Sequence, residues 1–468
     1  MNYSGVVRIL SMLGLFQAAG LVMGGAIALV YGEWPQLAAF AIALLFVSVT
    51  AASLLLLTPK PRRSSRARDG LAVVLLWWLL ASVSGAMPFM FDAPAGGVLL
   101  VWHEAVSCLT TTGHSVLPLA PSEWPVSLLA WRGFLHLSGA VTSLVTAASV
   151  FAALNIGGPG VHRTVLFTDP RGSFFDALPR VILAAGLAVG LLTLALAALL
   201  LAAGVPVGLA LGDAVSVATT GLVLPERAQM PPLSLLHSLI LFAGLVISTI
   251  GLAVALEIRA ARWRRVLRDP ESTTLVVILV TLVGALALAG APLFESLGLA
   301  ISLQSTAGLP LYPPERLGEA PLALLLFAPL VGGAALSTAG GIKLARLALL
   351  GARAGEEFAR LGFRDSVVVM RYRDRVQKDS AVIGVWVYLV AYLFALASIM
   401  LALSLIGMEF EDLAASAVGL LSNTGSLVDL PSGSNGGAGA LIAGFAMLLG
   451  RFEVIALIPA FTPSFWRG

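Results

Sequence analysis

Residues Thr110–Ser115 read TTTGHS, and this short polar stretch has three counterparts further along the chain. The counterparts are ATTGLV (Ala218–Val223), STAGLP (Ser305–Pro310) and SNTGSL (Ser422–Leu427). One such stretch would carry no weight, since about three Thr-Gly pairs are expected by chance in a chain of this length. Here, however, each stretch follows an apolar run of about a dozen residues, which is too short to cross a bilayer. The four stretches therefore predict a repeated architecture.

The composition is that of a membrane protein. The chain has 468 residues, of which 58% are hydrophobic and 11% charged, and its mean hydropathy is +0.96. Soluble domains carry roughly 25% charged residues. Runs of about 20 apolar residues recur from end to end, and each is long enough to cross the hydrocarbon core. The single cysteine, Cys108, excludes an intramolecular disulfide and a cysteine-rich metal site, and is expected to be a small buried residue.

Basic residues gather in four loops between the apolar runs. These loops span residues 58–70, 162–180, 257–272 and 351–380. Short loops with an excess of Lys and Arg lie on the cytoplasmic side, so we expect these loops and both termini in the cytoplasm, with the chain in the bacterial inner (plasma) membrane. The loops between them are rich in Pro and Gly and are expected outside. The net charge of +3 then reflects topology and contact with the lipid bilayer, not binding of nucleic acid.

The cytoplasmic loops divide the chain into parallel units. Two plain spans come first, within residues 1–58, and four units follow at 69–160, 176–258, 272–350 and 380–468. Each unit contains an outward span, a half-span, a polar stretch and a returning span. A half-span must enter from outside and return. We therefore expect an all-α polytopic membrane protein with four span–half-span–span pore units around a pseudo-fourfold axis, preceded by two extra spans, with ten full spans altogether.

The polar stretches suit a cation filter. Non-helical backbone survives at membrane depth only where it is buried in protein or lines a water-filled cavity. Glycine permits torsions that turn successive carbonyls toward an axis, and rings of carbonyl oxygens can replace the hydration shell of a cation. The half-spans add the negative ends of their dipoles. The predicted filter residues are Thr111, Thr112, Gly113, Thr219, Thr220, Gly221, Thr306, Ala307, Gly308, Asn423, Thr424 and Gly425.

Two longer stretches carry a family resemblance. The run RDGLAVVLLWWLLASVSGAMPFMFDA (Arg68–Ala93), followed by AVSCLTTTGHS, resembles the Trk/Ktr/HKT superfamily of potassium transporters, and the ending LLGRFEVIALIPAFTPSFWRG is similar to that of its TrkH branch. The resemblance covers nearly the whole chain. It implies K⁺ uptake with K⁺ at the filter carbonyls, no organic cofactor in this chain, a homodimer with one pore per protomer, and a cytosolic TrkA-like regulatory ring that binds a nucleotide.

The chain departs from the family pattern in three places. His114 follows the first filter glycine, Ser138 stands where a glycine pair is usual, and Ala307 replaces a threonine. These departures leave K⁺/Na⁺ discrimination open, as they leave open whether transport is coupled or channel-like. The loop 351–380, with Arg371, Arg373 and Arg375, is the expected docking place for the ring.

A second STAG, at Ser337–Gly340, lies inside the returning span of the third unit. Four glycines within ten residues cost about 4 kcal/mol of helix propensity relative to alanine, so we expect the span to be broken. In the resembling proteins a loop at the matching place closes the cavity under the filter. The expected gate residues are therefore Gly332, Gly333, Ser337, Thr338, Gly340, Gly341 and Lys343. The alternative is a stretch of small residues that packs helices tightly.

Other polar residues lie in apolar sequence. Arg451 is in the middle of the last span, where a charge indicates a functional site by default. The resemblance implies that Arg451 forms an electrostatic barrier in the pore. The alternative is a structural pair with a carboxylate such as Glu453, although residues two apart do not share a helix face. Acids near the starts of half-spans are interpreted as caps that also compensate the helix dipole, with an ion-attracting vestibule as the alternative; they are Asp213, Glu295, Glu411 and Asp412. Three further residues are interpreted as packing groups: His103, Glu104 and His136.

Other functions remain as alternatives. A Na⁺-coupled or weakly selective monovalent cation transporter would share this architecture. A secondary carrier with inverted repeats would need halves of opposite topology, whereas all four units start inside. An intramembrane enzyme would need a catalytic constellation, and the adjacent His114 and Ser115 have no third partner in the sequence. We therefore expect a transporter and not an enzyme.

Overall fold

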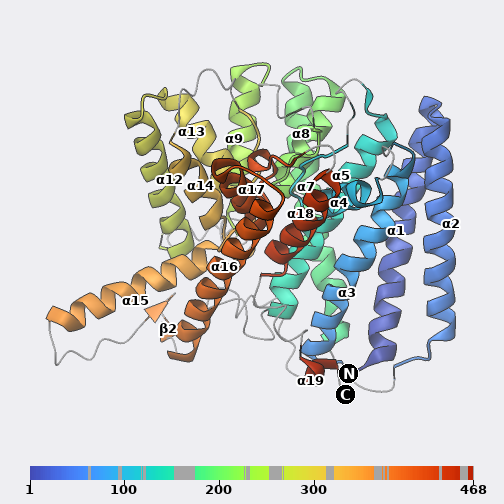
Figure 1. Ribbon diagram of the computed structural model, residues 1–468, viewed down its shortest axis with the longest axis horizontal. Coiled ribbons are helices and arrows are strands. Elements are labelled where there is room, and N and C mark those ends of the chain that lie inside the picture. Colours follow the sequence, from blue (N-terminus) through green and yellow to red (C-terminus); the bar gives the residue numbers. More distant parts are fainter. Residues whose placement is uncertain are drawn as a thin grey trace.

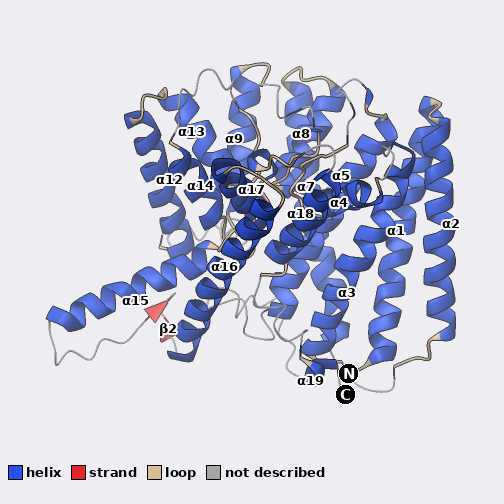
Figure 2. Ribbon diagram, in the orientation of Figure 1, coloured by secondary structure: helices blue, strands red, loops and turns tan. Residues whose placement is uncertain are grey.

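The computed structural model is a bundle of helices (Figures 1 and 2). It describes the chain except residues 62–64, 93–96, 118, 120–122, 152–173, 226, 228–231, 252–265, 267, 312–320, 363–370, 373–374, 377–378, 432–434, 454–461 and 467–468. Within the described part, the only strands are β1 (Arg371–Tyr372) and β2 (Arg375–Val376), which pair antiparallel. The expected all-α architecture is confirmed.

The helices come in the expected order. The N-terminal pair is α1 (Tyr3–Tyr31) and α2 (Trp34–Leu57). The first unit contains α3 (Ala67–Ala86), the 3-10 helix η1 (Met87–Asp92), α4 (Val98–Leu109), α5 (Val126–Val145) and the π-helical turn η3 (Thr146–Phe151). The second contains α7 (Phe174–Ala202), α8 (Val207–Thr219) and α9 (Leu235–Thr249).

The last two units repeat this order with one difference. The third contains α12 (Pro270–Leu288), α13 (Leu293–Gln304), α14 (Leu322–Val331) and α15 (Leu344–Gly362). The fourth contains α16 (Asp379–Leu405), α17 (Phe410–Ser422), the 3-10 turn η6 (Gly425–Leu427) and α18 (Gly436–Arg451), and the short α19 (Pro463–Trp466) follows. The returning span of the third unit is thus divided between α14 and α15.

Helix length separates spans from half-spans. Seven helices in the described part are long and apolar enough to cross a membrane. The four half-spans α4, α8, α13 and α17 have 12 or 13 residues each, well below the roughly 20 that a crossing requires. The continuation expected for the returning spans of units two and four, at 252–257 and 454–460, lies outside the described residues.

The same local sequence returns the chain into each later half-span. A glycine with positive φ follows the outward helix in units two, three and four: Gly204 (80°), Gly290 (99°) and Gly407 (87°). Glycine at this place ends a helix by adopting the left-handed conformation without steric cost. Proline then stands at the N-cap of α8 and of α13, as Pro206 and Pro292. The sharp turn from span to half-span is therefore encoded by glycine and proline.

The chain termini and the first basic loop share one end of the bundle. Figure 1 shows the N and C labels together there, and the half-spans lie toward the opposite end. The backbone N–H of Asn2 donates to Asp69 Oδ1 at 2.9 Å, and Arg8 Nη1 donates to the carbonyl oxygen of Thr58 at 3.1 Å. Phe175 N donates to Ser65 Oγ at 2.8 Å. The starts of α1, α3 and α7 and the end of α2 therefore meet at this end.

Helix α5 crosses the C-terminal end of α4 at very close range. Gly139 of α5 lies against the carbonyl group of Leu109, the last residue of α4, and a Cβ at this position would collide with that backbone. Ser138, where the family pattern has glycine, donates its hydroxyl to Leu135 of its own helix at 2.9 Å. The close approach therefore depends on Gly139 and tolerates the serine.

This contact gives a first prediction. Gly139→Ala should destabilise the protein by about 1–3 kcal/mol, because the new methyl group forces α5 away from α4. Gly186→Ala in α7 is the matched control, since a Cβ there meets nothing within 4 Å and alanine favours a helix. Thermal unfolding in detergent should show a lower melting temperature for the first variant and an unchanged or higher one for the second. Equal melting temperatures for wild type and Gly139→Ala would refute the contact.

Candidate functional site

The four polar stretches begin with the same backbone conformation. We call them segments 1 to 4 (residues 110–115, 218–223, 305–310 and 422–427). Each has a residue with positive φ just after its short helix: Thr111 (58°), Thr220 (52°), Thr306 (59°) and Asn423 (60°). All four residues are fully buried. The three threonines are β-branched and rarely adopt this conformation, which costs about 1–3 kcal/mol, whereas asparagine tolerates it. A conformation repeated at four equivalent places, and unfavourable at three of them, indicates a site built for a function.

The segments lie side by side as a ring. A Cβ on Gly113 would collide with the backbone of Leu222, and a Cβ on Gly425 would collide with the carbonyl oxygen of Thr112. Segment 1 therefore lies between segments 2 and 4. Gly308 lies equally close to Ser426, so segment 3 adjoins segment 4. Segments 2 and 3 share one apolar cluster through Leu222 and Leu309. The chain thus brings together four stretches that are far apart in sequence.

The backbone hydrogen bonds correct the register of segment 2. Gly221 N donates to the carbonyl oxygen of Ser216, just as Thr112 N donates to that of Ser107, both at 2.9 Å. Gly221 is therefore level with Thr112, and Leu222 is level with Gly113. The sequence analysis aligned the four stretches by their glycines and so placed Gly221 level with Gly113, which is wrong by one residue. The feature that is equivalent between the segments is the left-handed residue and not the glycine.

Hydroxyl groups of the short helices hold the segments from behind. Ser107 Oγ donates to the carbonyl oxygen of His114 at 2.6 Å, and Ser302 Oγ donates to that of Leu309 at 2.6 Å. In segment 2, Ser216 Oγ accepts from Val223 N at 3.1 Å. These three serines each stand four residues before the left-handed residue. The fourth unit has Gly419 at this place, and Ser416 bonds to the backbone of Asp429 instead.

The same bonds decide where the carbonyl groups point. Gly113 N donates to Ser107 of α4 at 3.1 Å, and Gly308 N donates to Ser302 of α13 at 3.3 Å. In a planar trans peptide the C=O group points opposite to the N–H group. The carbonyls of Thr112 and Ala307 therefore point away from their short helices, toward the neighbouring segments. One level below, Thr112 N also donates to Ser107, and its counterparts in segments 2 and 4 are Gly221 N and Thr424 N. These bonds turn the carbonyls of Thr111, Thr220 and Asn423 away from their short helices in the same way.

The predicted break in the third returning span is confirmed. Helix α14 ends at Val331 and α15 begins at Leu344, and we call residues 332–343 the broken stretch. Most of it is buried. Gly340 N donates to Thr306 Oγ1 at 2.8 Å, and Gly340 also lies against the carbonyl oxygen of Ser422. The broken stretch therefore contacts segments 3 and 4 directly at their helix ends.

Arg451 connects the broken stretch to segment 1. Its Nε donates to the carbonyl oxygen of Thr110 at 2.6 Å, and its Nη1 donates to that of Thr338 at 2.8 Å; Nη2 bonds to the Thr111 hydroxyl. Glu453 pairs with Arg346 instead, at the start of α15. The alternative of an Arg451–Glu453 pair is therefore wrong.

Several anchors fix the broken stretch at its ends. Ala334 N donates to the carbonyl oxygen of Thr249 at 3.0 Å, and Ala335 N donates to Glu271 Oε2 at 2.8 Å. The Lys343 ammonium bonds to the carbonyl oxygen of Ala339 within the stretch. Lys343 itself has a φ of 74°. The stretch is thus tied to α9 and α12 near its start, and its one ammonium group is satisfied by its own backbone.

The structure corrects one of the interpretations of the half-span acids. Asp213 does not cap a helix: it lies in the middle of α8, is fully buried, and bonds to Arg227 Nε at 2.7 Å and His237 Nε2 at 2.8 Å. The other three acids lie in the first turns of α13 and α17, where a negative charge compensates the helix dipole. The partners of Asp213 come from residues that lie 14 and 24 positions away, which no local pattern connects.

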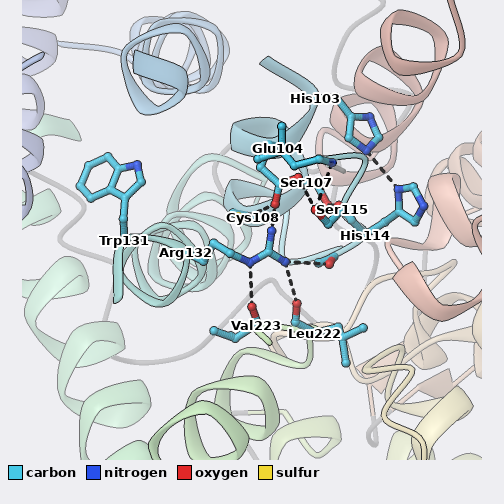
Figure 3. A network of polar contacts seen from close by, with 12 residues as sticks. His103, Glu104, Ser107, Cys108, His114, Ser115, Trp131, Arg132, Leu222 and Val223 are labelled. Atoms are coloured by element: carbon cyan, nitrogen blue, oxygen red, sulfur yellow. Dashed lines mark hydrogen bonds and ion pairs between the residues drawn. The ribbon is translucent and has the colours of Figure 1, made fainter. Parts of the chain in front are cut away.

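One functional candidate was missed by the sequence analysis. Arg132 of α5 is fully buried behind segments 1 and 2, where it pairs with Glu104 and donates to backbone carbonyl oxygens (Figure 3). The sequence did contain a signal for Arg132, because a charge inside a predicted span indicates function by default.

The residues interpreted as buried or packing groups have different surroundings. Cys108 is buried as expected. His103 has polar partners, whereas the ring nitrogens of His136 bond to no described residue and its ring lies against Gly221.

Comparison with known proteins gives a consistent result. No protein-family model matches the chain. The Trk system potassium uptake proteins TrkH of Salmonella typhimurium and of Escherichia coli K12 are each 28% identical to it over 100% of both chains. TrkI of Halomonas elongata is 25% identical over 100% of this chain and 97% of the relative. The crystal structure of the potassium transporter TrkH from Vibrio parahaemolyticus matches with a TM-score of 0.85 and 24% identity over 100% of both chains.

These matches confirm the resemblance stated from the sequence, over the whole chain, and the structural match confirms the fold. With the seven long apolar helices, they make this a multi-pass membrane protein. The relatives are named as uptake proteins, in agreement with the expectation of a transporter and not an enzyme.

Proposed function

We propose that this TrkH-like chain takes up potassium ions across the bacterial inner membrane through the ring of segments 1 to 4. The observation that carries the proposal is the buried left-handed residue repeated at four equivalent places, with the carbonyl of that residue or of the next one turned away from the short helix in each segment. The names of the full-length relatives support potassium as the ion. Rings of carbonyl oxygens suit a dehydrated monovalent cation.

The local electrostatics favour a cation at the ring. Helices α4, α8, α13 and α17 all end at the segments, so the negative ends of their dipoles meet there. The segments themselves contain no carboxylate. Binding therefore depends on carbonyl dipoles, which are easier for a moving ion to leave than fixed charges. The proposed ligands are carbonyl groups at two adjacent levels: those of Thr111, Thr220 and Asn423 at one level, and those of Thr112 and Ala307 at the next.

We assign the broken stretch as the gate and Arg451 as the barrier below the filter. An ion leaving segments 3 and 4 would meet the broken stretch at Gly340. It would also meet a guanidinium group that bonds to Thr110 and Thr338. Like charges in a buried site repel strongly. Opening then requires the stretch to leave Thr306 and Ser422, with Arg451 released from Thr338.

Regulation would reach the gate through α15. This helix begins at Leu344, directly after the broken stretch, and ends at Gly362, so it includes the first part of the basic loop 351–380. In Figure 1 it projects away from the bundle. We propose that a cytosolic TrkA-like ring, carrying the nucleotide, docks on this loop and favours one state of the gate. Such coupling requires different affinities for the open and closed forms. A homodimer with one pore per protomer is part of the same proposal.

The filter glycines give a direct test. Gly113→Ser should lower the preference for K⁺ over Na⁺ about tenfold, or by about 1.4 kcal/mol, because its side chain would force segments 1 and 2 apart. The measurement is ⁸⁶Rb⁺ flux into proteoliposomes, competed by K⁺ and by Na⁺. Gly190→Ser in α7, where a Cβ meets nothing within 4 Å, is the control. If K⁺ and Na⁺ compete as in the wild type in the serine variants of Gly113, Gly308 and Gly425, the hypothesis that segments 1 to 4 form the filter is rejected.

The wild type itself tests the alternative function. Equal competition by Na⁺ and K⁺ would favour a weakly selective transporter.

The gate is tested by shortening the broken stretch. Deletion of residues 335–340 should raise Rb⁺ flux several-fold, because the obstruction under the filter is removed while segments 1 to 4 keep their sequence. Arg451→Ala should act in the same direction, since its bond to Thr338 is lost. Flux and competition are measured in the same proteoliposomes. If flux falls and selectivity is lost together, the stretch supports the filter and does not gate it.

The partner proposal is tested on the loop. Replacing Arg371, Arg373 and Arg375 by glutamine should weaken binding of the ring by about tenfold and leave K⁺/Na⁺ competition unchanged. Nucleotide should change flux only when the ring is present. The control replaces Lys60, Arg66 and Arg68 in the first basic loop. Wild-type affinity of the ring for the triple variant of the third loop would remove that loop from the interface.

A further inference from the structure

We propose that Arg132 is a positioning residue that locks the outer ends of segments 1 and 2 from behind, with Glu104 as its counter-charge, and that this lock is needed for ion discrimination. The inference rests on the proposed function, since it concerns the same filter. Neither residue lies in a segment, and neither was needed to describe the ring.

The guanidinium group of Arg132 holds two segments at once. Nη2 donates to the carbonyl oxygens of Gly113 at 2.9 Å and Leu222 at 3.3 Å, and Nε donates to that of Val223 at 2.7 Å. Figure 3 shows the guanidinium group between His114 and Ser115 of segment 1 and Leu222 and Val223 of segment 2, with dashed lines from it to the carbonyl oxygens of Leu222 and Val223. Gly113 and Leu222 are level in the corrected register. Arg132 therefore joins equivalent positions of neighbouring segments, which the planar, multi-donor guanidinium group is suited to do.

Glu104 holds the arginine and the next part of segment 1. It forms an ion pair with Arg132, and both side chains are fully buried. Its other oxygen, Oε2, accepts from Ser115 Oγ at 2.8 Å. A buried charge without a counter-charge is strongly unfavourable, so Glu104 keeps Arg132 charged and in place. The ring of Trp124 lies over the guanidinium carbon at 5.3 Å, and completes the enclosure.

Side chains of α4 hold the remaining residue of this outer end. Ser107 Oγ bonds to the carbonyl oxygen of His114, and the ring of His114 contacts that of His103 through Nδ1 and Nε2 at 3.2 Å. Every residue from Gly113 to Ser115 is therefore held by a side chain of α4 or α5. The outer end of segment 1 is thus bonded to side chains of two helices, α4 and α5.

The lock has a consequence for the pore. A carbonyl that accepts from Arg132 faces the guanidinium group and is not free to turn toward the centre. The peptide on its other side is held by the bond from Gly113 N to Ser107. The carbonyl of Thr112 belongs to that held peptide, which directly precedes the peptide held by Arg132. In segment 2 the carbonyl of Thr220 is held by the bond from Gly221 N to Ser216, and Arg132 holds the carbonyls of Leu222 and Val223 further along. Loss of the lock would let Gly113 and Leu222 rotate, and the spacing that separates K⁺ from Na⁺ would relax.

The test compares two buried arginines. Arg132→Lys keeps the charge and removes the planar fork. Arg227→Lys is the matched control: Arg227 is also fully buried and paired with a carboxylate, Asp213, and no side-chain bond from it to segments 1 to 4 is seen among the described residues. We expect the first variant to lose about tenfold in K⁺ over Na⁺ preference in the Rb⁺ competition assay, and the second to keep the wild-type preference.

A second readout does not depend on transport. K⁺ that binds the filter should raise the melting temperature of the detergent-solubilised wild type more than Na⁺ does, because a ligand stabilises the state that binds it. This difference should be lost in Arg132→Lys and kept in Arg227→Lys. If Arg132→Lys does not fold, Glu104→Gln, which removes only the counter-charge, should show a loss of at least about threefold in preference.

The outcomes separate the two proposals. A wild type that shows no K⁺-dependent flux and no K⁺-specific stabilisation overturns the proposed function. A selective wild type together with unchanged preference and stabilisation in Arg132→Lys, or in Glu104→Gln where the first variant does not fold, overturns the lock alone. An equal loss in Arg132→Lys and Arg227→Lys overturns it too, because any disturbed buried ion pair would then have the same effect.

Discussion

The structure depends on one constraint: a backbone that leaves the helix inside a membrane protein must still bond its N–H groups. In each segment this is achieved by a return to the short helix, from Thr112, Gly221, Gly308 and Thr424 to carbonyls of α4, α8, α13 and α17. The left-handed residue makes the return possible, since it reverses the chain within one residue. Because the donors face the helix, the acceptors face the neighbours. A site rich in carbonyl oxygen is therefore a consequence of satisfying the donors.

The sequence was informative wherever the cause is local. The half-spans and the broken stretch follow from the length of the apolar runs and from glycine, and they were predicted at nearly the right residues. The turns into the half-spans were not predicted, although glycine and proline mark them locally. The register of segment 2 was not, because Gly221 is the conspicuous residue whereas Thr220 carries the left-handed torsion. Asp213 and Arg132 were misjudged or missed for another reason. Their partners come from other elements, and a single sequence does not report which side chains meet.

The buried arginines divide into two kinds by their partners. Arg132 and Arg346 each have a carboxylate, Glu104 and Glu453, so their charge is compensated. Arg451 bonds only to carbonyl oxygens and a hydroxyl in the described part of the chain. Its guanidinium group is therefore hydrogen-bonded, but no carboxylate in the described part of the chain neutralises its charge. A compensated charge suits a structural tie, because its field is short-ranged. An uncancelled one suits a barrier to cations, and Arg451 is the residue beside the broken stretch.

The two halves of the ring are consequently supported by different parts of the structure. Segments 1 and 2 are joined at their outer ends by Arg132, which is carried by a continuous helix, α5. Segments 3 and 4 are contacted from below by Gly340, in a stretch without helix. If the stretch moves as proposed, the hydroxyl of Thr306 loses a donor and Ser422 loses a neighbour, while Arg132 keeps its three carbonyls. Segment 1 meets the broken stretch through Arg451, and release of Arg451 from Thr338 leaves its bonds to Thr110 and Thr111 in place. Opening the gate would then loosen segments 3 and 4, and the filter can keep its spacing through segments 1 and 2, which Arg132 joins.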